Sequence, residues 1–114
     1  MRVGIFDHMD CAHSVKALDG CDVTHGHTYK VEVVVEGPLV GGMVMDFKAL
    51  REVARRVMGK YDHKDLSALF EVPSAENIVN ALFLDLKKEL PGVYSVKMWE
   101  GYNKWAEATR EDFK

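Results

Sequence analysis

The strongest constraint on the fold is an alternation of mostly apolar and mostly polar residues between positions 25 and 36. Positions of even parity carry Lys30, Glu32 and Glu36, whereas the odd positions are mostly apolar. Such alternation is typical of a strand that buries one face and exposes the other. The buried parity comprises His25, His27, Tyr29, Val31, Val33 and Val35.

A second alternating segment covers residues 2–15. Asp19-Gly20 then supplies a turn before the segment that begins at His25, so the two segments predict a pair of strands. His13 falls on the apolar side of the first strand, as His25 and His27 do on the second. That apolar side also carries Val3, Ile5, Met9, Cys11 and Val15.

The middle of the chain has helical periodicity instead. Asp46 offers an N-cap to a helix over residues 47–58 that ends near Gly59. Pro73-Ser74 opens a second amphipathic stretch, which Pro91-Gly92 closes. Its apolar stripe comprises Ile78, Val79, Leu82, Phe83, Leu86 and Leu90.

Alternation returns between residues 93 and 100, where Glu100 ends the apolar row of Tyr94, Val96 and Met98. The pattern of Trp105, Glu107 and Thr109 predicts a short last strand. The order is therefore β-β-α-α-β-β. It predicts an α+β fold in which two helices cover one face of an antiparallel sheet, and we expect another subunit to cover the other face.

Length and charge narrow the classes of function. The 114 residues predict a single domain spanning 1–114. The formal net charge of -3, with basic residues scattered among acids, argues against nucleic-acid binding. There is no apolar run long enough for a membrane span and no signal-peptide pattern at the N-terminus. We expect a cytoplasmic protein with reduced cysteines.

Three histidines on matching strand faces suggest a metal site. His13, His25 and His27 would supply three nitrogens and leave a position open, as catalytic zinc sites do. Cys21 lies four residues before His25 and has two interpretations. It could close the site as a fourth, structural ligand, or act as a thiolate base or nucleophile beside the substrate. Cys11 is interpreted as a packing residue.

Two further sites that contain an acidic residue each have two interpretations. Asp62-His63 lies between the predicted helices and could be a solvated loop, or an imidazole whose basicity a carboxylate raises. Glu100 could pair with a lysine, or accept two parallel N–H bonds from a flat heterocycle at the mouth of a pocket.

In combination, several motifs resemble the family of 6-pyruvoyltetrahydropterin synthase and its relative 6-carboxytetrahydropterin synthase of the queuosine route. The resemblance runs nearly end to end. It implies the tunnelling fold (T-fold), in which subunits join their sheets into a barrel, usually a hexamer, with active sites between subunits. The motifs are Ala12-His13, Cys21-x-x-x-His25-Gly26-His27-x-Tyr29, Met45-Asp46-Phe47-x-x-Leu50, Asp62-His63-x-x-Leu66-Ser67, Pro73-Ser74-x-Glu76-Asn77-Ile78 and Trp99-Glu100.

The resemblance also implies roles for individual residues. Zinc would be held by the three histidines, His13, His25 and His27. Cys21 would be the catalytic thiolate, Asp62 with His63 the partner acid/base pair, and Glu100 the anchor of the pterin ring. The implied substrate is 7,8-dihydroneopterin triphosphate, from which triphosphate is eliminated.

The products differ between the two family activities. The carboxy synthase also breaks a carbon–carbon bond and releases acetaldehyde, whereas the pyruvoyl synthase keeps the side chain. The three-residue gap between Cys21 and His25 resembles the carboxy synthase. In contrast, Met9-Asp10-Cys11 replaces the aromatic and small residues common in the family before Ala12-His13. A non-catalytic alternative is a zinc-stabilised pterin-binding protein whose metal site Cys21 closes.

Overall fold

Four strands form one antiparallel sheet in the order β1-β2-β3-β4. The computed structural model describes residues 1–13 and 25–113, with the side chains of residue 13 and residues 25–27 outside the description. The strands are β1 (Arg2–His13), β2 (His25–Glu36), β3 (Val93–Glu100) and β4 (Lys104–Thr109). Consecutive strands pair, so β1 and β4 are the two edges of the sheet.

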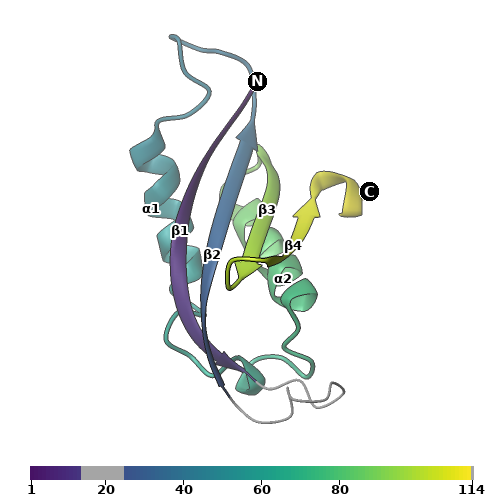
Figure 1. The fold of residues 1–114 in the computed structure, drawn as a ribbon. Helices are drawn as coiled ribbons and strands as arrows, with labels where there is room; N and C mark the ends of the chain where they lie inside the picture. Colours follow the sequence, from purple (N-terminus) through teal and green to yellow (C-terminus); the bar gives the residue numbers. More distant parts are fainter. Residues whose placement is uncertain (14–24, 114) are drawn as a thin grey trace.

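Two α-helices lie on one side of this sheet, and no helix of the described residues lies on the other side (Figure 1). Helix α1 (Phe47–Met58) begins at Asp46, whose side chain accepts a hydrogen bond from the backbone N–H of Lys48. Helix α2 (Ala75–Glu89) begins at Ser74, whose hydroxyl accepts one from the N–H of Asn77. There are also two short 3₁₀ helices, η1 (Leu66–Ala68) before α2 and η2 (Arg110–Phe113) directly after β4. Of the helices described, none is long and apolar enough to cross a membrane.

The core lies between the helices and the covered face of the sheet. Alternate residues of β2 face it, as the sequence pattern predicts, and Tyr29 and Val31 are fully buried. The stripe of α2 packs on β3 and β4, and burial of such apolar surface is the main stabilising contribution to a domain of this size. The largest fully buried side chains are those of Met9, Tyr29, Val31, Val33, Leu50, Leu66, Ile78, Leu82, Phe83, Leu86 and Met98.

The predicted order of elements is confirmed, and so is the position of both helices on one face of the sheet. The first strand was expected over residues 2–15; its described part ends at His13, and residues 14 and 15 lie outside the description. Neither 3₁₀ helix was predicted, because a single turn is too short to show periodicity.

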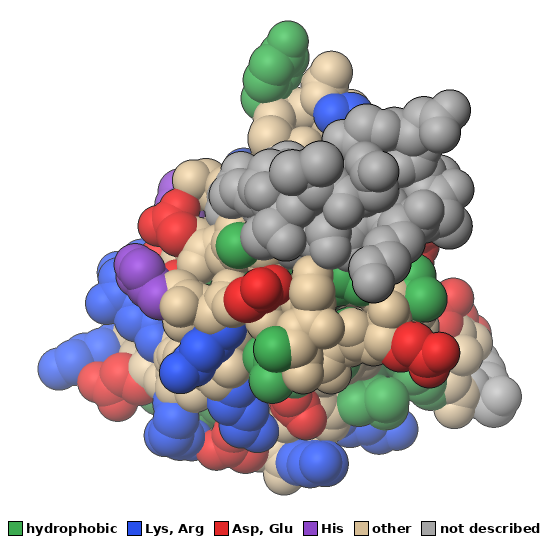
Figure 2. Space-filling model, turned by 90° about the horizontal axis from the view of Figure 1, so that it is seen from below, with side chains coloured by type: hydrophobic (Ala, Val, Ile, Leu, Met, Phe, Trp, Pro, Cys, Tyr) green, Lys and Arg blue, Asp and Glu red, His purple; other side chains and the backbone are tan. Residues whose placement is uncertain are grey.

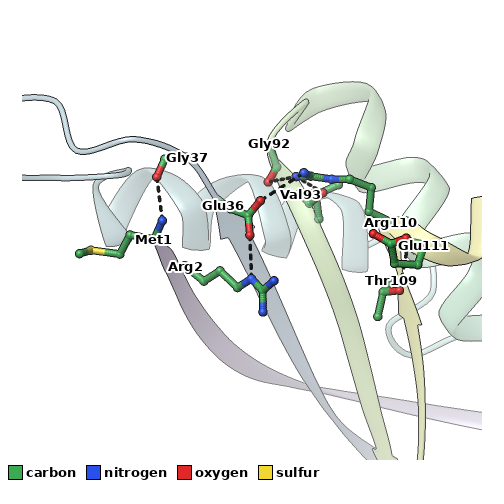
Figure 3. Close-up of polar contacts among 9 residues, drawn as sticks. All are labelled: Met1, Arg2, Glu36, Gly37, Gly92, Val93, Thr109, Arg110 and Glu111. Carbon is green, nitrogen blue, oxygen red and sulfur yellow. Dashed lines mark hydrogen bonds and ion pairs between the residues drawn. The ribbon is translucent and has the colours of Figure 1, made fainter. Parts of the chain in front are cut away.

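A polar network closes the end of the sheet where β2 ends and β3 begins (Figure 3). Glu36 accepts a hydrogen bond from Arg2 Nε (2.8 Å) and pairs with Arg110 Nη1 (3.4 Å). Arg110 also donates to the carbonyls of Gly92 and Val93. The Arg2 guanidinium lowers the pKa of Glu36. This network joins the first strand to the last segment, at the end of the sheet opposite the three histidines.

One ion pair ties α1 to the edge strand and predicts a pH-dependent contribution to stability. Arg55 donates a hydrogen bond to Asp7 (2.5 Å), which lowers the pKa of that carboxyl. A lowered pKa means that the stabilisation is complete above the unfolded-state value near 4 and is lost as pH falls through the folded-state value. Because Arg55 is 64% exposed, we expect Asp7→Asn to cost only about 0.5 kcal/mol at pH 7. Urea unfolding at pH 7 and pH 2.5 checks this: the difference from the wild type should disappear at the lower pH.

Candidate active site

The predicted metal ligands lie at the end of the β1–β2 hairpin. In the register of the two strands, His13 is directly opposite His25, and Cys11 is opposite His27. The backbones of the three histidines are thus neighbours, although the description leaves out their side chains. Their strand positions have the same parity as Cys11 and Tyr29, which are buried on the helix-covered face.

This backbone arrangement fits a zinc ion. Directly opposed residues of an antiparallel pair have Cβ atoms about 4.5–5.5 Å apart, and positions two apart on a strand are about 6.6–6.8 Å apart. Three imidazoles on such positions can converge on one cation, and neutral imidazole is a favoured ligand of zinc. The register therefore supports the three-histidine set that the sequence predicts.

The segment after α1 runs along the free edge of β1 and brings Asp62-His63 to the same end of the sheet. Cys11 Sγ donates to the carbonyl of Tyr61 (3.1 Å), and the N–H of Ala12 donates to the carbonyl of Lys64 (3.1 Å). Ala12 and Asp65 form an isolated parallel bridge. Residues 61–65 are thus attached to the edge strand immediately before His13.

Asp10 makes the shortest of the hydrogen bonds that attach this segment to β1. Its N–H donates to Asp62 Oδ1 (2.8 Å), and its carbonyl accepts from the N–H of His63 (2.6 Å). His63 is in the left-handed region with φ of 60°, and it is the one residue other than glycine with positive φ in the described part of the chain. A histidine in that region is strained, and strain of this kind clusters at functional sites.

Asp62 and His63 form the pair that an acid/base role requires. His63 Nδ1 lies 3.1 Å from Asp62 Oδ2, and the imidazole is 77% exposed. When Nδ1 donates to a carboxylate, the second ring nitrogen is left to exchange protons with a substrate. An open pocket of about 500 Å³ adjoins it, lined by Asp10, Cys11, Ala12, Thr28, His63, Lys64 and Asp65. Histidine and acidic side chains lie next to one another in the view onto this end of the molecule (Figure 2).

The two cysteines differ in what the structure shows of them. Cys11 is 5% exposed, and burial raises the pKa of its thiol to about 11. It is a packing residue, as expected, and it stays protonated at neutral pH. Cys21, the predicted thiolate, lies outside the described residues.

Glu100 ends β3 on the helix-covered face, as its parity predicts. It is half-buried and directly opposite Tyr29 in the register of β2 and β3. Burial, followed by the charge of Glu100, raises the pKa of the Tyr29 hydroxyl. Along β2, the next position of that parity is His27, so in the register Glu100 lies close to the predicted metal ligands.

Sequence reasoning missed two residues of this site, Asp10 and Thr28. Both are on the exposed parity of their strands, where polar residues are ordinary, and they are directly opposite in the β1–β2 register. The Thr28 hydroxyl donates to Asp10 Oδ1 (2.6 Å). The departure of Met9-Asp10-Cys11 from the family pattern was the one available signal.

Comparisons with known proteins identify the family of the chain. The model of the family described as 6-pyruvoyl tetrahydropterin synthase matches residues 3–111. A protein of Archaeoglobus fulgidus provisionally named 6-carboxy-5,6,7,8-tetrahydropterin synthase is 38% identical over 111 residues, 96% of each chain. The dihydroneopterin monophosphate aldolase of Pyrococcus furiosus is 40% identical over 95 residues, 81% of this chain and 82% of the relative.

A solved structure shows the fold independently. The 6-pyruvoyl tetrahydropterin synthase of Caenorhabditis elegans superposes with a TM-score of 0.88 at 21% identity, covering 96% of this chain and 94% of that one. The chain therefore has the tunnelling fold that the motifs predict. Together with the match over residues 3–111, this similarity means that the chain belongs to the 6-pyruvoyl tetrahydropterin synthase family of lyases.

Proposed function

We propose that this protein is a zinc-dependent 6-carboxytetrahydropterin synthase of 7-deazaguanine biosynthesis, which converts 7,8-dihydroneopterin triphosphate to 6-carboxytetrahydropterin, acetaldehyde and triphosphate. The observation that carries the proposal is the attachment of the Asp62–His63 pair to β1. It brings a proton-transfer group to the strand end that carries His13. The similarity to the Archaeoglobus fulgidus protein supports the same activity.

His13, His25 and His27 would hold the zinc, as their register and donor chemistry allow. Bound there, the metal would stabilise negative charge that develops on oxygens of the substrate side chain. Loss of a ligand is then a strong prediction: we expect His25→Ala to lower zinc content and thermal stability together, because metal binding contributes to folding. Metal analysis of the purified variant beside the wild type checks this, and a wild-type zinc content would contradict it.

Side chains of the protein would transfer the protons and bind the pterin ring. His63, oriented through Nδ1 by Asp62, would take a proton from the side chain of the substrate and return it. Cys21 would act as the second base. Glu100 would accept two N–H bonds from the pterin ring and so fix the side chain relative to His63.

The spacing of Cys21 and His25 favours the carboxy synthase over the pyruvoyl synthase. The three-residue gap places the thiol close in sequence to the metal ligands. A base at that place can serve carbon–carbon bond cleavage after triphosphate has left. If the side chain is instead kept, the product is that of the pyruvoyl synthase, which is the sister activity.

We also propose that subunits assemble into a barrel, as a hexamer. β1 and β4 are the edge strands of the sheet, although residues 61–65 attach to β1 at its His13 end, and none of the described helices lies on the other face of the sheet. Exposed edges of this kind are usually paired or covered in the native state. In such a barrel the pterin site would lie between subunits.

A second activity is favoured by a specific similarity. The Pyrococcus furiosus relative is a dihydroneopterin monophosphate aldolase and is 40% identical. Cleavage of the side chain of dihydroneopterin monophosphate would use the same metal and proton-transfer groups. The two activities differ in the phosphate group that the substrate carries.

The test is to incubate the zinc-loaded protein with 7,8-dihydroneopterin triphosphate and, separately, with the monophosphate. We expect a carboxypterin and an equal amount of acetaldehyde from the triphosphate, resolved by mass spectrometry. A pyruvoyl product would establish the sister activity, and turnover of the monophosphate alone would establish the aldolase. No product from either substrate would leave the non-catalytic pterin-binding alternative.

A further inference from the structure

Asp10 and Thr28 form a hydrogen-bonded pair on the open face of the sheet, beside the Asp62–His63 pair. The Thr28 hydroxyl donates to Asp10 Oδ1 at 2.6 Å. Atoms of the Asp10 carboxylate, the Asp62 carboxylate and the His63 imidazole all lie within 4.8 Å of one another. Asp10 therefore contributes a second carboxylate to the surroundings of the imidazole.

The main chain of Asp10 holds the pair as well. Its N–H donates to Asp62, and its carbonyl accepts from the N–H of His63, whose φ is positive. A change in the position of Asp10 is therefore transmitted to both members of the pair. These two main-chain contacts persist when the Asp10 side chain is replaced, so a substitution can isolate the contribution of the carboxylate.

Two carboxylates, those of Asp10 and Asp62, thus lie beside the same imidazole. Each is held by its own donor, Asp10 by the Thr28 hydroxyl and Asp62 by the Asp10 N–H. The two donors therefore keep both carboxylates in place beside the imidazole of His63.

We infer that Asp10 and Thr28 are positioning residues for the acid/base pair, which hold the imidazole of His63 in the orientation that proton transfer needs. The inference rests on the proposed function, in which His63 transfers the proton. Thr28 acts through Asp10, and Asp10 acts through His63. Neither is assigned a contact with the substrate.

The experiment compares Thr28→Val, which removes the hydroxyl but keeps the shape, with Thr28→Ser, which keeps the hydroxyl. We expect Thr28→Val and Asp10→Asn each to lower kcat about tenfold, with KM and zinc content unchanged, and Thr28→Ser to retain kcat. The double variant should lose no more than Asp10→Asn alone, because Thr28 acts through that carboxylate. Glu32→Gln is the matched control: it removes a carboxylate from the same face of β2 and should leave kcat unchanged.

A measurement without substrate separates this inference from the proposed function. Nitrogen-15 NMR of the zinc-loaded protein reports the tautomer of His63, assigned by its loss in His63→Gln. We expect the Nδ1-protonated form in the wild type and in Thr28→Ser, and a mixture of tautomers in Thr28→Val. If no pterin is turned over, the proposed function fails, yet this spectrum still decides the inference. The inference would be overturned if Thr28→Val showed the wild-type His63 spectrum and the wild-type kcat. It would also be overturned if the variant lost activity through a raised KM or a lowered zinc content.

Discussion

His63→Gly should abolish turnover without destabilising the protein. The substitution removes the imidazole that would transfer the proton, a contribution of about 10²–10⁴ in rate for a positioned acid or base. It also places glycine at a φ of 60°, which a histidine adopts only with strain. Strain relief of about 1–2 kcal/mol is partly offset by the greater freedom of glycine in the unfolded chain. The free energy of unfolding of His63→Gly should therefore equal that of the wild type or exceed it by up to about 1 kcal/mol.

Steady-state kinetics and urea unfolding of His63→Gly measure the two effects side by side. The matched variant is Lys64→Gly, at the next residue of the same segment, where φ is not positive. That substitution relieves no strain and should cost about 0.5–1 kcal/mol. A His63→Gly protein that keeps its activity would remove His63 from the mechanism. A loss of stability equal to that of Lys64→Gly would show that the left-handed conformation carries no strain.

The second large effect is expected from Cys21→Ala, which should retain zinc and lose turnover. If Cys21 is the thiolate base, three histidines still hold the metal and the missing group is a proton acceptor. If Cys21 closes the metal site, its removal opens a coordination position and both zinc content and stability fall. We expect zinc at the wild-type level and a rate loss of about 10²–10⁴.

Metal analysis, thermal unfolding and product formation on one preparation of Cys21→Ala distinguish the two interpretations. Cys11→Ala is the matched cysteine variant, because Cys11 is buried and its thiol contacts the carbonyl of Tyr61. It should lower stability through lost packing and leave zinc in place. Zinc loss in Cys21→Ala would support the non-catalytic protein in which the cysteine is a fourth ligand.

Most of the fold could be predicted from local signals in the sequence. The helix over residues 47–58 has an N-cap at Asp46 and a regular apolar face, and the structure gives it the same bounds. β2 shows alternation over enough residues to identify its buried face. The row predicted for β3 holds at Val96 and Met98 but is wrong at Tyr94. A register irregularity opposite Val34 and Val35 buries Val93 and Ser95 instead, and Tyr94 is half-buried with the Arg2 guanidinium over its ring. The face of the sheet on which Glu100 lies was also predictable, because Glu100 continues the alternation of Val96 and Met98.

The surroundings of the acid/base pair could not be predicted in this way. Attachment of residues 61–65 to β1 depends on backbone hydrogen bonds between segments about 50 residues apart, and these leave no periodic signal. The positive φ of His63 is likewise imposed by tertiary contacts rather than by residue type. Asp10 and Thr28 occur on exposed strand positions where any polar residue would be unremarkable.

The position of the bound zinc tests the central claim most directly, because more than one group of residues could hold a cation. One comprises His13, His25 and His27, and the other comprises Asp10, Asp62 and His63. Anomalous diffraction at the zinc edge from crystals of the zinc-loaded protein locates the ion. We expect a single peak among the three histidines, with Asp62 and His63 still paired. A peak at Asp10, Asp62 and His63 instead would mean that these residues bind metal, and it would contradict both the acid/base role and the proposed reaction.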